Sequence, residues 1–335
     1  MEKIWPLFLF LICGLTFAFF KLSESPVSVL VIGGGPAGLA TAIEAKQTGA
    51  KVTVIEKRSA YERTQQLFLR GQALTLLEKW EVESSHLKKV EIGDKRVGFI
   101  PISALEEALL KRAQELGVCL IQDDFIELSN ERSVILCKRG AVPYDILVAA
   151  DGSHSQVRQA LSIELDLIGQ GKAGAALLPS DDVGSGPIDV SPAIQHSASF
   201  VQKFQVPGFN FIFLQGPFSA TRDDFITLCK ASGWDRQAEQ IAANEALLLL
   251  DADVYLQKAR KFSLEDRRAL LVGDAAGTGS FFRGSGANHA LESAAIAGRF
   301  FKTKDFKRFD AEMDQATRAF IEDSSFLFVN ASATR

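Results

Sequence analysis

Residues 27–56 of the chain read VSVLVIGGGPAGLATAIEAKQTGAKVTVIE, and this stretch decides the fold. The run VSVLVI over 27–32 is apolar and β-branched, which is typical of a buried parallel strand. Leu39–Thr48 carries apolar residues at helical spacing, and a second strand over Lys51–Ile55 ends on Glu56. The order of strand, glycine-rich turn, helix and strand predicts a βαβ unit that binds a dinucleotide.

The turn between the first strand and the helix carries the glycines of a dinucleotide-binding site. Gly33 permits the tight turn, Gly35 lets the backbone approach a pyrophosphate, and Gly38 lets the helix pack closely on the strand. The helix N-terminus offers free N–H groups to the phosphates. Glu56 can accept hydrogen bonds from both ribose hydroxyls, which favours FAD or NAD over NADP. The cofactor-binding residues predicted for this unit are Gly33, Gly34, Gly35, Pro36, Ala37, Gly38, Glu56 and Lys57.

Two later segments favour FAD over NAD. An apolar strand runs into Asp151-Gly152, and another, ALLV over 269–272, runs into Gly273-Asp274. A carboxylate at the carboxyl end of a parallel strand lies in the crevice where such sheets bind ligands, and it can accept hydrogen bonds from a ribityl chain. The segment GSGAN over 284–288 opens an alanine-rich helix whose amides can stabilise negative charge on a flavin. These segments add Asp151, Asp274, Gly284, Gly286, Ala287 and Asn288 to the predicted cofactor site.

The three segments resemble those of group A FAD-dependent monooxygenases, which share the para-hydroxybenzoate hydroxylase fold within the glutathione-reductase-like FAD superfamily. The resemblance covers about residues 26–165 and 255–320. Within it, VIEKRSAYERTQQLFL over 54–69 and ISALEEALLKRAQELGV over 102–118 are similar to the flavin domain of MICAL-type monooxygenases. The resemblance implies that Asp151 serves both FAD and a transient NAD(P)H site. Arg70 resembles a helix arginine beside the flavin pyrophosphate, although an ordinary solvated charge explains it equally well.

The chain departs from the family pattern at two places. Ile102-Ser103 stands where the family usually has an arginine or glutamine that contacts FAD, and Gly277 stands where the monooxygenases usually have a histidine. The string GDAAG over 273–277 is more similar to geranylgeranyl reductases and flavin halogenases. Two alternatives therefore remain beside the monooxygenase, namely a reductase or dehydrogenase of an unsaturated lipid or isoprenoid and a non-catalytic flavin-binding protein.

The N-terminus carries 17 uncharged residues, Ile4–Phe20, between two lysines. This run spans about 25 Å as a helix, close to the hydrocarbon thickness of a bilayer. A single membrane anchor over 1–25 is favoured over a signal peptide or a core helix, because the run lacks both a clear cleavage site and periodic polar positions. We therefore expect a membrane-associated protein with its catalytic domain in the cytoplasm.

The expected fold class is α/β, with a discontinuous Rossmann-like FAD-binding domain over 26–165 and 255–325. The inserted α+β substrate domain is expected over 166–254, and a C-terminal tail over 326–335. Within the insertion, Ser199–Val206 and Phe209–Leu214 read as strands and 223–250 as helices. Phenylalanines cluster on those strands, which indicates an apolar substrate cavity or simple core packing.

Composition limits the possible functions. With 37 Lys and Arg against 41 Asp and Glu, the net charge of −4 gives no attraction to nucleic acid, and four scattered cysteines predict neither a disulfide framework nor a metal site. The predicted function is an FAD-dependent oxidoreductase, most readily a monooxygenase. It would be reduced by NAD(P)H, capture O₂ as a flavin C4a-hydroperoxide and hydroxylate an apolar or aromatic small molecule. His196 and His289 are candidate acid–base groups, but no catalytic side chain is assigned.

Overall fold

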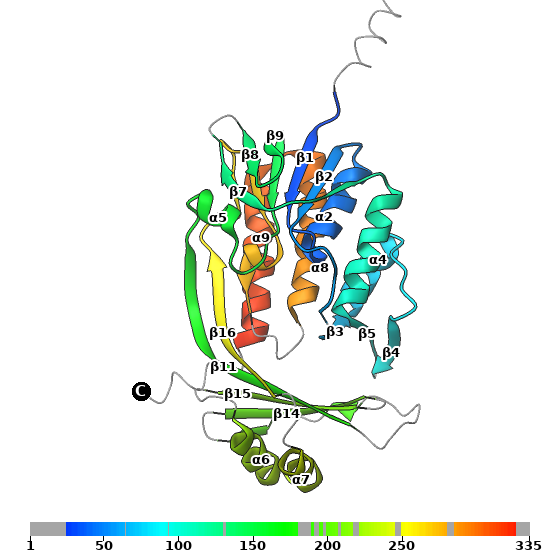
Figure 1. Cartoon of the computed structure of the whole chain (residues 1–335), viewed down its shortest axis with the longest axis vertical. Helices are drawn as coiled ribbons and strands as arrows, with labels where there is room; N and C mark the ends of the chain where they lie inside the picture. The colour runs from blue at the N-terminus through cyan, green and yellow to red at the C-terminus, as the bar shows by residue number, and fades with distance from the viewer. Residues whose placement is uncertain are drawn as a thin grey trace, which may run out of the picture.

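A six-stranded sheet forms the centre of the computed structural model, in the order β17-β18-β10-β1-β2-β6 (Figure 1). All neighbours are parallel except β17, which is antiparallel to β18. The bounds are β1 Ser28–Ile32, β2 Lys51–Glu56, β6 Cys119–Gln122, β10 Ile146–Ala149, β17 Ser263–Leu264 and β18 Ala269–Leu271. The structure describes residues 25–325 except 64, 93, 130–131, 180–188, 191–193, 197–198, 207–208, 217–220, 245–248 and 280–284.

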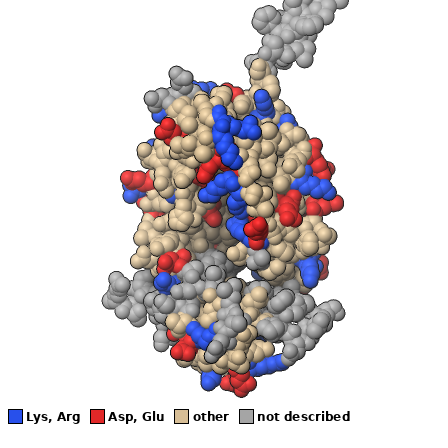
Figure 2. Space-filling view, viewed as in Figure 1, with Lys and Arg blue, Asp and Glu red and all other residues tan. Residues whose placement is uncertain are grey.

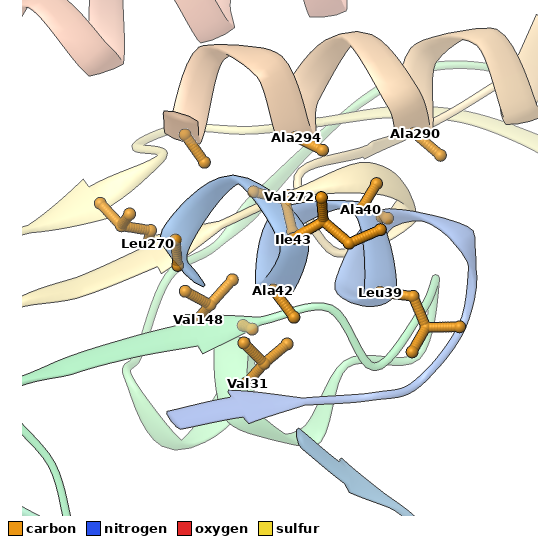
Figure 3. Packing of buried hydrophobic residues seen from close by; sticks show 14 of the residues in the cluster. Val31, Leu39, Ala40, Ala42, Ile43, Val148, Leu270, Val272, Ala290 and Ala294 are labelled. Atoms are coloured by element: carbon orange, nitrogen blue, oxygen red, sulfur yellow. The ribbon is translucent and has the colours of Figure 1, made fainter. Parts of the chain in front are cut away.

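Helix α2, Pro36–Gln47, lies between this sheet and helix α8, Ser285–Thr303. Figure 3 shows Ala42 of α2 above the strand residues Val31 and Val148, while Ile43 lies on the side of α2 that faces α8. Nine consecutive residues of α2, Ala37–Ala45, are buried, and four of them are alanines, whose small side chains favour close packing of the two helices. Proline at the first helical position explains why α2 begins three residues before the predicted start.

The second large sheet runs β12-β14-β15-β11-β16-β19, with β13 on β14. Its long strands β11 and β16 extend beside the first sheet and then cross below it in Figure 1, where α6 and α7 cover the far side. The bounds are β11 Leu165–Pro179, β12 Asp189–Val190, β13 Ile194–His196, β14 Ser199–Val206, β15 Phe209–Gly216, β16 Leu249–Ala259, β19 Gly277–Thr278, α6 Arg222–Ala231 and α7 Asp235–Ala243.

The two strands predicted within the insertion are therefore present as β14 and β15, which pair antiparallel. The predicted helical region over 223–250 is wrong at its end, because residues 249–250 open strand β16. These residues form a strand because they pair with β11, which lies about 80 residues away in the chain. Such a distant partner leaves no local signal in the sequence.

Two small sheets and the remaining helices complete the chain. Strands β3-β5-β4 pack with α3, and strand β7 of the β7-β8-β9 sheet contacts α5. The bounds are β3 Gln66–Arg70, β4 Lys88–Ile92, β5 Lys95–Pro101, β7 Phe125–Leu128, β8 Ser133–Leu136, β9 Gly140–Pro143, α3 Gly71–Lys79, α4 Ile102–Glu115, α5 Gln156–Ala160, α9 Phe306–Ser325 and a short 3₁₀ turn over Gly273–Ala275.

Candidate functional site

The glycine-rich turn joins β1 to α2 at the carboxyl edge of the parallel sheet. A Cβ atom on Gly33 would overlap the carbonyl of Ala150, which follows β10, and Gly33 also has a positive φ of 104°. A Cβ atom on Gly38 would overlap the carbonyl oxygen of Gly33. These two glycines are therefore required by the packing of the turn itself.

Gly35 differs from the other two glycines because nothing crowds it. A Cβ atom there would lie 3.9 Å from the nearest atom, Oε1 of Glu106, and Gly35 has the extended backbone of a helix N-cap. No side chain caps α2, and its first turn holds no acidic residue. The amides that follow Pro36 are thus free for an anionic ligand, and the turn fits the pyrophosphate of a dinucleotide.

Glu56 ends β2 beside the turn, as predicted, but its carboxylate already has several donors. The amide of Gly34 donates to Oε2 at 2.8 Å, and Arg58 donates its amide and Nε to Oε1 at 2.8 and 3.0 Å. Burial would raise the pKa of Glu56, but the hydrogen bonds and charge of Arg58 together with the Gly34 amide outweigh it and lower that pKa. A ribose would therefore share an ionised Glu56 with Arg58.

Arg58, Arg63 and Glu106 form a cluster that the sequence did not single out. Glu106, on α4, is fully buried, and its Oε1 accepts hydrogen bonds from Arg58 Nη2 at 3.3 Å and from Arg63 Nη2. Arg58 also lies over the ring of Tyr61, whose hydroxyl donates to the Gly34 carbonyl at 2.7 Å. Each residue alone looks like a solvated charge in the sequence, so only the tertiary contact reveals the cluster. Lys57, which we predicted as a cofactor contact, is exposed beside it.

Asp274 lies across the turn, after β18. It reaches solvent, yet the protein that surrounds it raises the pKa of its carboxyl to about 6, because desolvation outweighs the opposing charge of Arg63. Arg63 therefore lies near both Glu106 and Asp274. Figure 2 shows basic side chains gathered in a column down the middle of one face, with acidic side chains among them.

Asp151 and Arg158 are both engaged within the protein. Asp151 Oδ2 accepts hydrogen bonds from the amides of Gln156 and Val157, at 2.8 and 3.2 Å, and so caps α5. The buried Arg158 donates to the carbonyls of Ser153 and Ala275, at 3.3 and 3.2 Å. Because Ala275 follows Asp274, Arg158 supports the turn that holds Asp274. The structure thus gives Asp151 a capping contact, and its predicted contact with the cofactor stays a prediction.

The start of α8 lies against β3. Asn288 accepts a hydrogen bond from the Arg70 amide and donates to the Phe68 carbonyl, each at 2.8 Å, while the Arg70 guanidinium pairs with Asp323 of α9. Arg70 therefore lies at the start of α8, with its guanidinium engaged by α9. Gly286 is open and Ala287 is 9% exposed, whereas Gly284 lies outside the described residues.

His289, the candidate acid–base group on α8, points into the protein. It is 2% exposed, its ring stacks on Phe320 at 4.6 Å, and neither ring nitrogen has a hydrogen-bond partner. Burial lowers its pKa to about 4. The burial of its side chain against α9 argues against a role as an acid–base group that contacts substrate.

The fold and the glycine turn together are those of an α/β protein that binds a dinucleotide. Residues 27–172 match the family model of pyridine nucleotide-disulphide oxidoreductases. The chain is 35% identical over 140 residues to [F-actin]-monooxygenase Mical of Drosophila melanogaster, which covers 38% of this chain and 3% of that protein. It is 28% identical over 172 residues to the FAD-dependent monooxygenase notI of Aspergillus sp. (strain MF297-2), covering 42% of this chain and 40% of that protein.

Solved structures share the fold over nearly the whole chain. PqsL of P. aeruginosa in complex with 2-aminobenzoylacetate has a TM-score of 0.70 at 16% identity, covering 90% of this chain and 95% of that one. The tetrameric form of 2-methyl-3-hydroxypyridine-5-carboxylic acid oxygenase has a TM-score of 0.64 at 18% identity, covering 90% and 88%. These similarities confirm the predicted resemblance to flavin monooxygenases, including the local similarity to the MICAL type.

The predicted N-terminal anchor over 1–25 precedes the described residues apart from its last residue. Among the residues that the structure describes, no helix has both the length and the apolar character needed to cross a membrane.

Proposed function

We propose that the chain is an FAD-dependent monooxygenase that takes reducing equivalents from NAD(P)H and adds one oxygen atom of O₂ to an apolar or aromatic small molecule. The observation that carries this proposal is the glycine turn, with open amides on α2 and Asp274 opposite, set within a fold shared with flavin monooxygenases. FAD, when bound, supplies the redox and oxygen chemistry.

The residues of this chain would bind and orient the cofactor. The α2 amides and Gly35 would receive the pyrophosphate, with Arg58 and Arg63 as positive charges beside it. Glu56 would accept a hydrogen bond from the adenosine ribose, and Asp274 from the ribityl hydroxyls. The first turn of α8, at Gly286–Asn288, would face the flavin ring and favour negative charge on it.

We also propose that residues 1–25 anchor the protein in a membrane, with the enzyme domain on the cytoplasmic side. The support is the uncharged run Ile4–Phe20 between lysines. Flotation of the full chain with phospholipid vesicles, compared with a chain that starts at Pro26, tests this. Equal flotation of both chains would contradict it.

Anaerobic reduction followed by an oxygen pulse tests the monooxygenase proposal. The purified full chain should be yellow, should bleach with NADPH or NADH, and should reoxidise with incorporation of ¹⁸O from ¹⁸O₂ into an aromatic product. Slow reaction with O₂ combined with reduction of an isoprenoid double bond would favour the reductase instead. A preparation that binds no FAD would contradict both.

Asp274→Asn should weaken FAD binding by about tenfold, because a charged acceptor of the ribityl hydroxyls becomes a neutral one, a loss of roughly 1.4 kcal/mol. The dissociation constant is measured by quenching of flavin fluorescence on titration into flavin-free protein at pH 8, above the raised pKa of about 6. Asp266→Asn, at an exposed position shortly before β18, is the matched control and should bind as the wild type does. Equal binding by both variants would remove Asp274 from the site.

A further inference from the structure

Glu106 is a buried carboxylate that the proposed chemistry leaves unexplained. Its side chain has no exposure, its Oε1 receives both guanidinium groups, and its Oε2 has no hydrogen-bond partner. A buried carboxylate oxygen without a partner is unfavourable, because it has lost its hydration and gained no hydrogen bond in return. A group kept at such a cost serves a purpose beyond filling space.

The position of Glu106 indicates that purpose. Its Oε1 lies 3.9 Å from the Cβ position of Gly35, directly beside the turn that fits a pyrophosphate. An isolated carboxylate there would repel the phosphates. The charge of Glu106 is instead neutralised by two guanidinium groups, since Arg58 and Arg63 both donate hydrogen bonds to its Oε1. The charge of Arg63 also partly opposes the rise in the pKa of Asp274 that burial causes, so this charge acts across the turn.

The segment that carries Arg58 and Arg63 does little to fix the position of their side chains. Both arginines come from the segment that follows β2, whose described residues, 57–63 and 65, belong to no helix or strand. Their side chains are 32% and 43% exposed, and a free arginine loses rotamer entropy when it binds a ligand. A rigid acceptor on α4 restricts both guanidinium groups before a ligand arrives.

We propose that Glu106 is a positioning residue, which holds Arg58 and Arg63 beside the phosphate-binding turn so that they bind the pyrophosphate of FAD. The inference rests on the proposed FAD site. The network Glu56–Arg58–Glu106–Arg63 carries no net charge, so it acts by fixing where its positive groups lie and not by raising the local positive charge.

Flavin-free full chain is titrated with FAD and, separately, with riboflavin, which lacks the phosphates and the adenosine. Glu106→Ala should weaken FAD binding about tenfold and leave riboflavin binding unchanged. Glu106→Gln keeps the side-chain volume and should show a smaller loss of the same kind. Glu107→Ala, at the exposed neighbour on α4, is the control and should match the wild type. Thermal unfolding without flavin checks that each variant folds.

A double-mutant cycle with Arg63→Met separates positioning from general destabilisation. If Glu106 acts through Arg63, the double variant should bind FAD as weakly as Arg63→Met alone. Additive losses, equal losses for riboflavin, or tighter FAD binding by Glu106→Gln would each overturn the proposal. Failure of the wild type to bind FAD would instead overturn the proposed function, which keeps the two failures apart.

Discussion

A Gly38→Ala variant is expected to lose at least about 3 kcal/mol of folding free energy, because its Cβ would overlap the carbonyl oxygen of Gly33. That oxygen belongs to the turn between β1 and α2, so it cannot move without displacing the helix from the sheet. Thermal unfolding of the flavin-free protein should shift by roughly 10 °C. The same variant should also fail to bind FAD tightly, since the α2 amides move with the helix.

Gly35→Ala is the matched variant, and it separates folding from binding. Its Cβ would make only an ordinary contact with Glu106, and its φ of −77° suits alanine. The melting temperature should stay within a few degrees of the wild type, while FAD affinity falls because the methyl group blocks the approach of the pyrophosphate. A Gly38→Ala variant with wild-type stability would show that the turn is looser than the structure indicates.

The sequence predicted the parts of the site that depend on local backbone geometry. The glycine turn, Glu56 at the end of β2 and Asp274 after β18 all follow from short segments whose spacing has a physical reason. The strands β14 and β15 were also predictable, because both are rich in aromatic and β-branched residues and flank a Pro-Gly pair. The pattern that predicts these two strands is local, so it can be recognised without knowledge of a distant partner strand.

Contacts between distant segments could not be predicted in this way. Arg63 meets Glu106 across 43 residues, and Arg70 meets Asp323 across 253 residues, and in the sequence each resembles a solvated charge. The motif around Asp151 was visible in the sequence, but the hydrogen bonds of its carboxylate to the start of α5 were not. Residue type and position in a motif therefore predicted a candidate site, whereas the direction of each charged side chain came only from the fold.

Acid should destabilise the protein through His289. The folded state lowers the pKa of this buried imidazole to about 4, whereas an unfolded histidine titrates near 6.5. Below pH 6.5 the unfolded state therefore binds a proton that the folded state does not. The effect of His289 on the free energy of unfolding is absent above about pH 7. At pH 4 it lowers this free energy by roughly 3 kcal/mol.

The wild-type curve alone does not isolate this effect, because Asp274 acts in the opposite direction. Its raised pKa of about 6 makes the folded state bind a proton before the unfolded state does, which adds stability as the pH falls from 6 to 4. The difference between wild type and His289→Leu removes the Asp274 contribution, since both proteins carry that carboxyl. Leucine is similar in volume to histidine and leaves no buried ring nitrogen without a partner.

Urea unfolding of both proteins at pH 7 and pH 4 measures the difference. Between pH 7 and pH 4, the free energy of unfolding of the wild type should fall by roughly 3 kcal/mol more than that of His289→Leu. His86→Leu, which replaces an exposed histidine, should keep the wild-type pH dependence. If His289→Leu follows the wild-type curve, the imidazole must have a hydrogen-bond partner in solution, such as a buried water between α8 and α9. In that case the unpartnered hydroxyls of Thr317 and Ser324 on α9 would be the next candidates for binding that water.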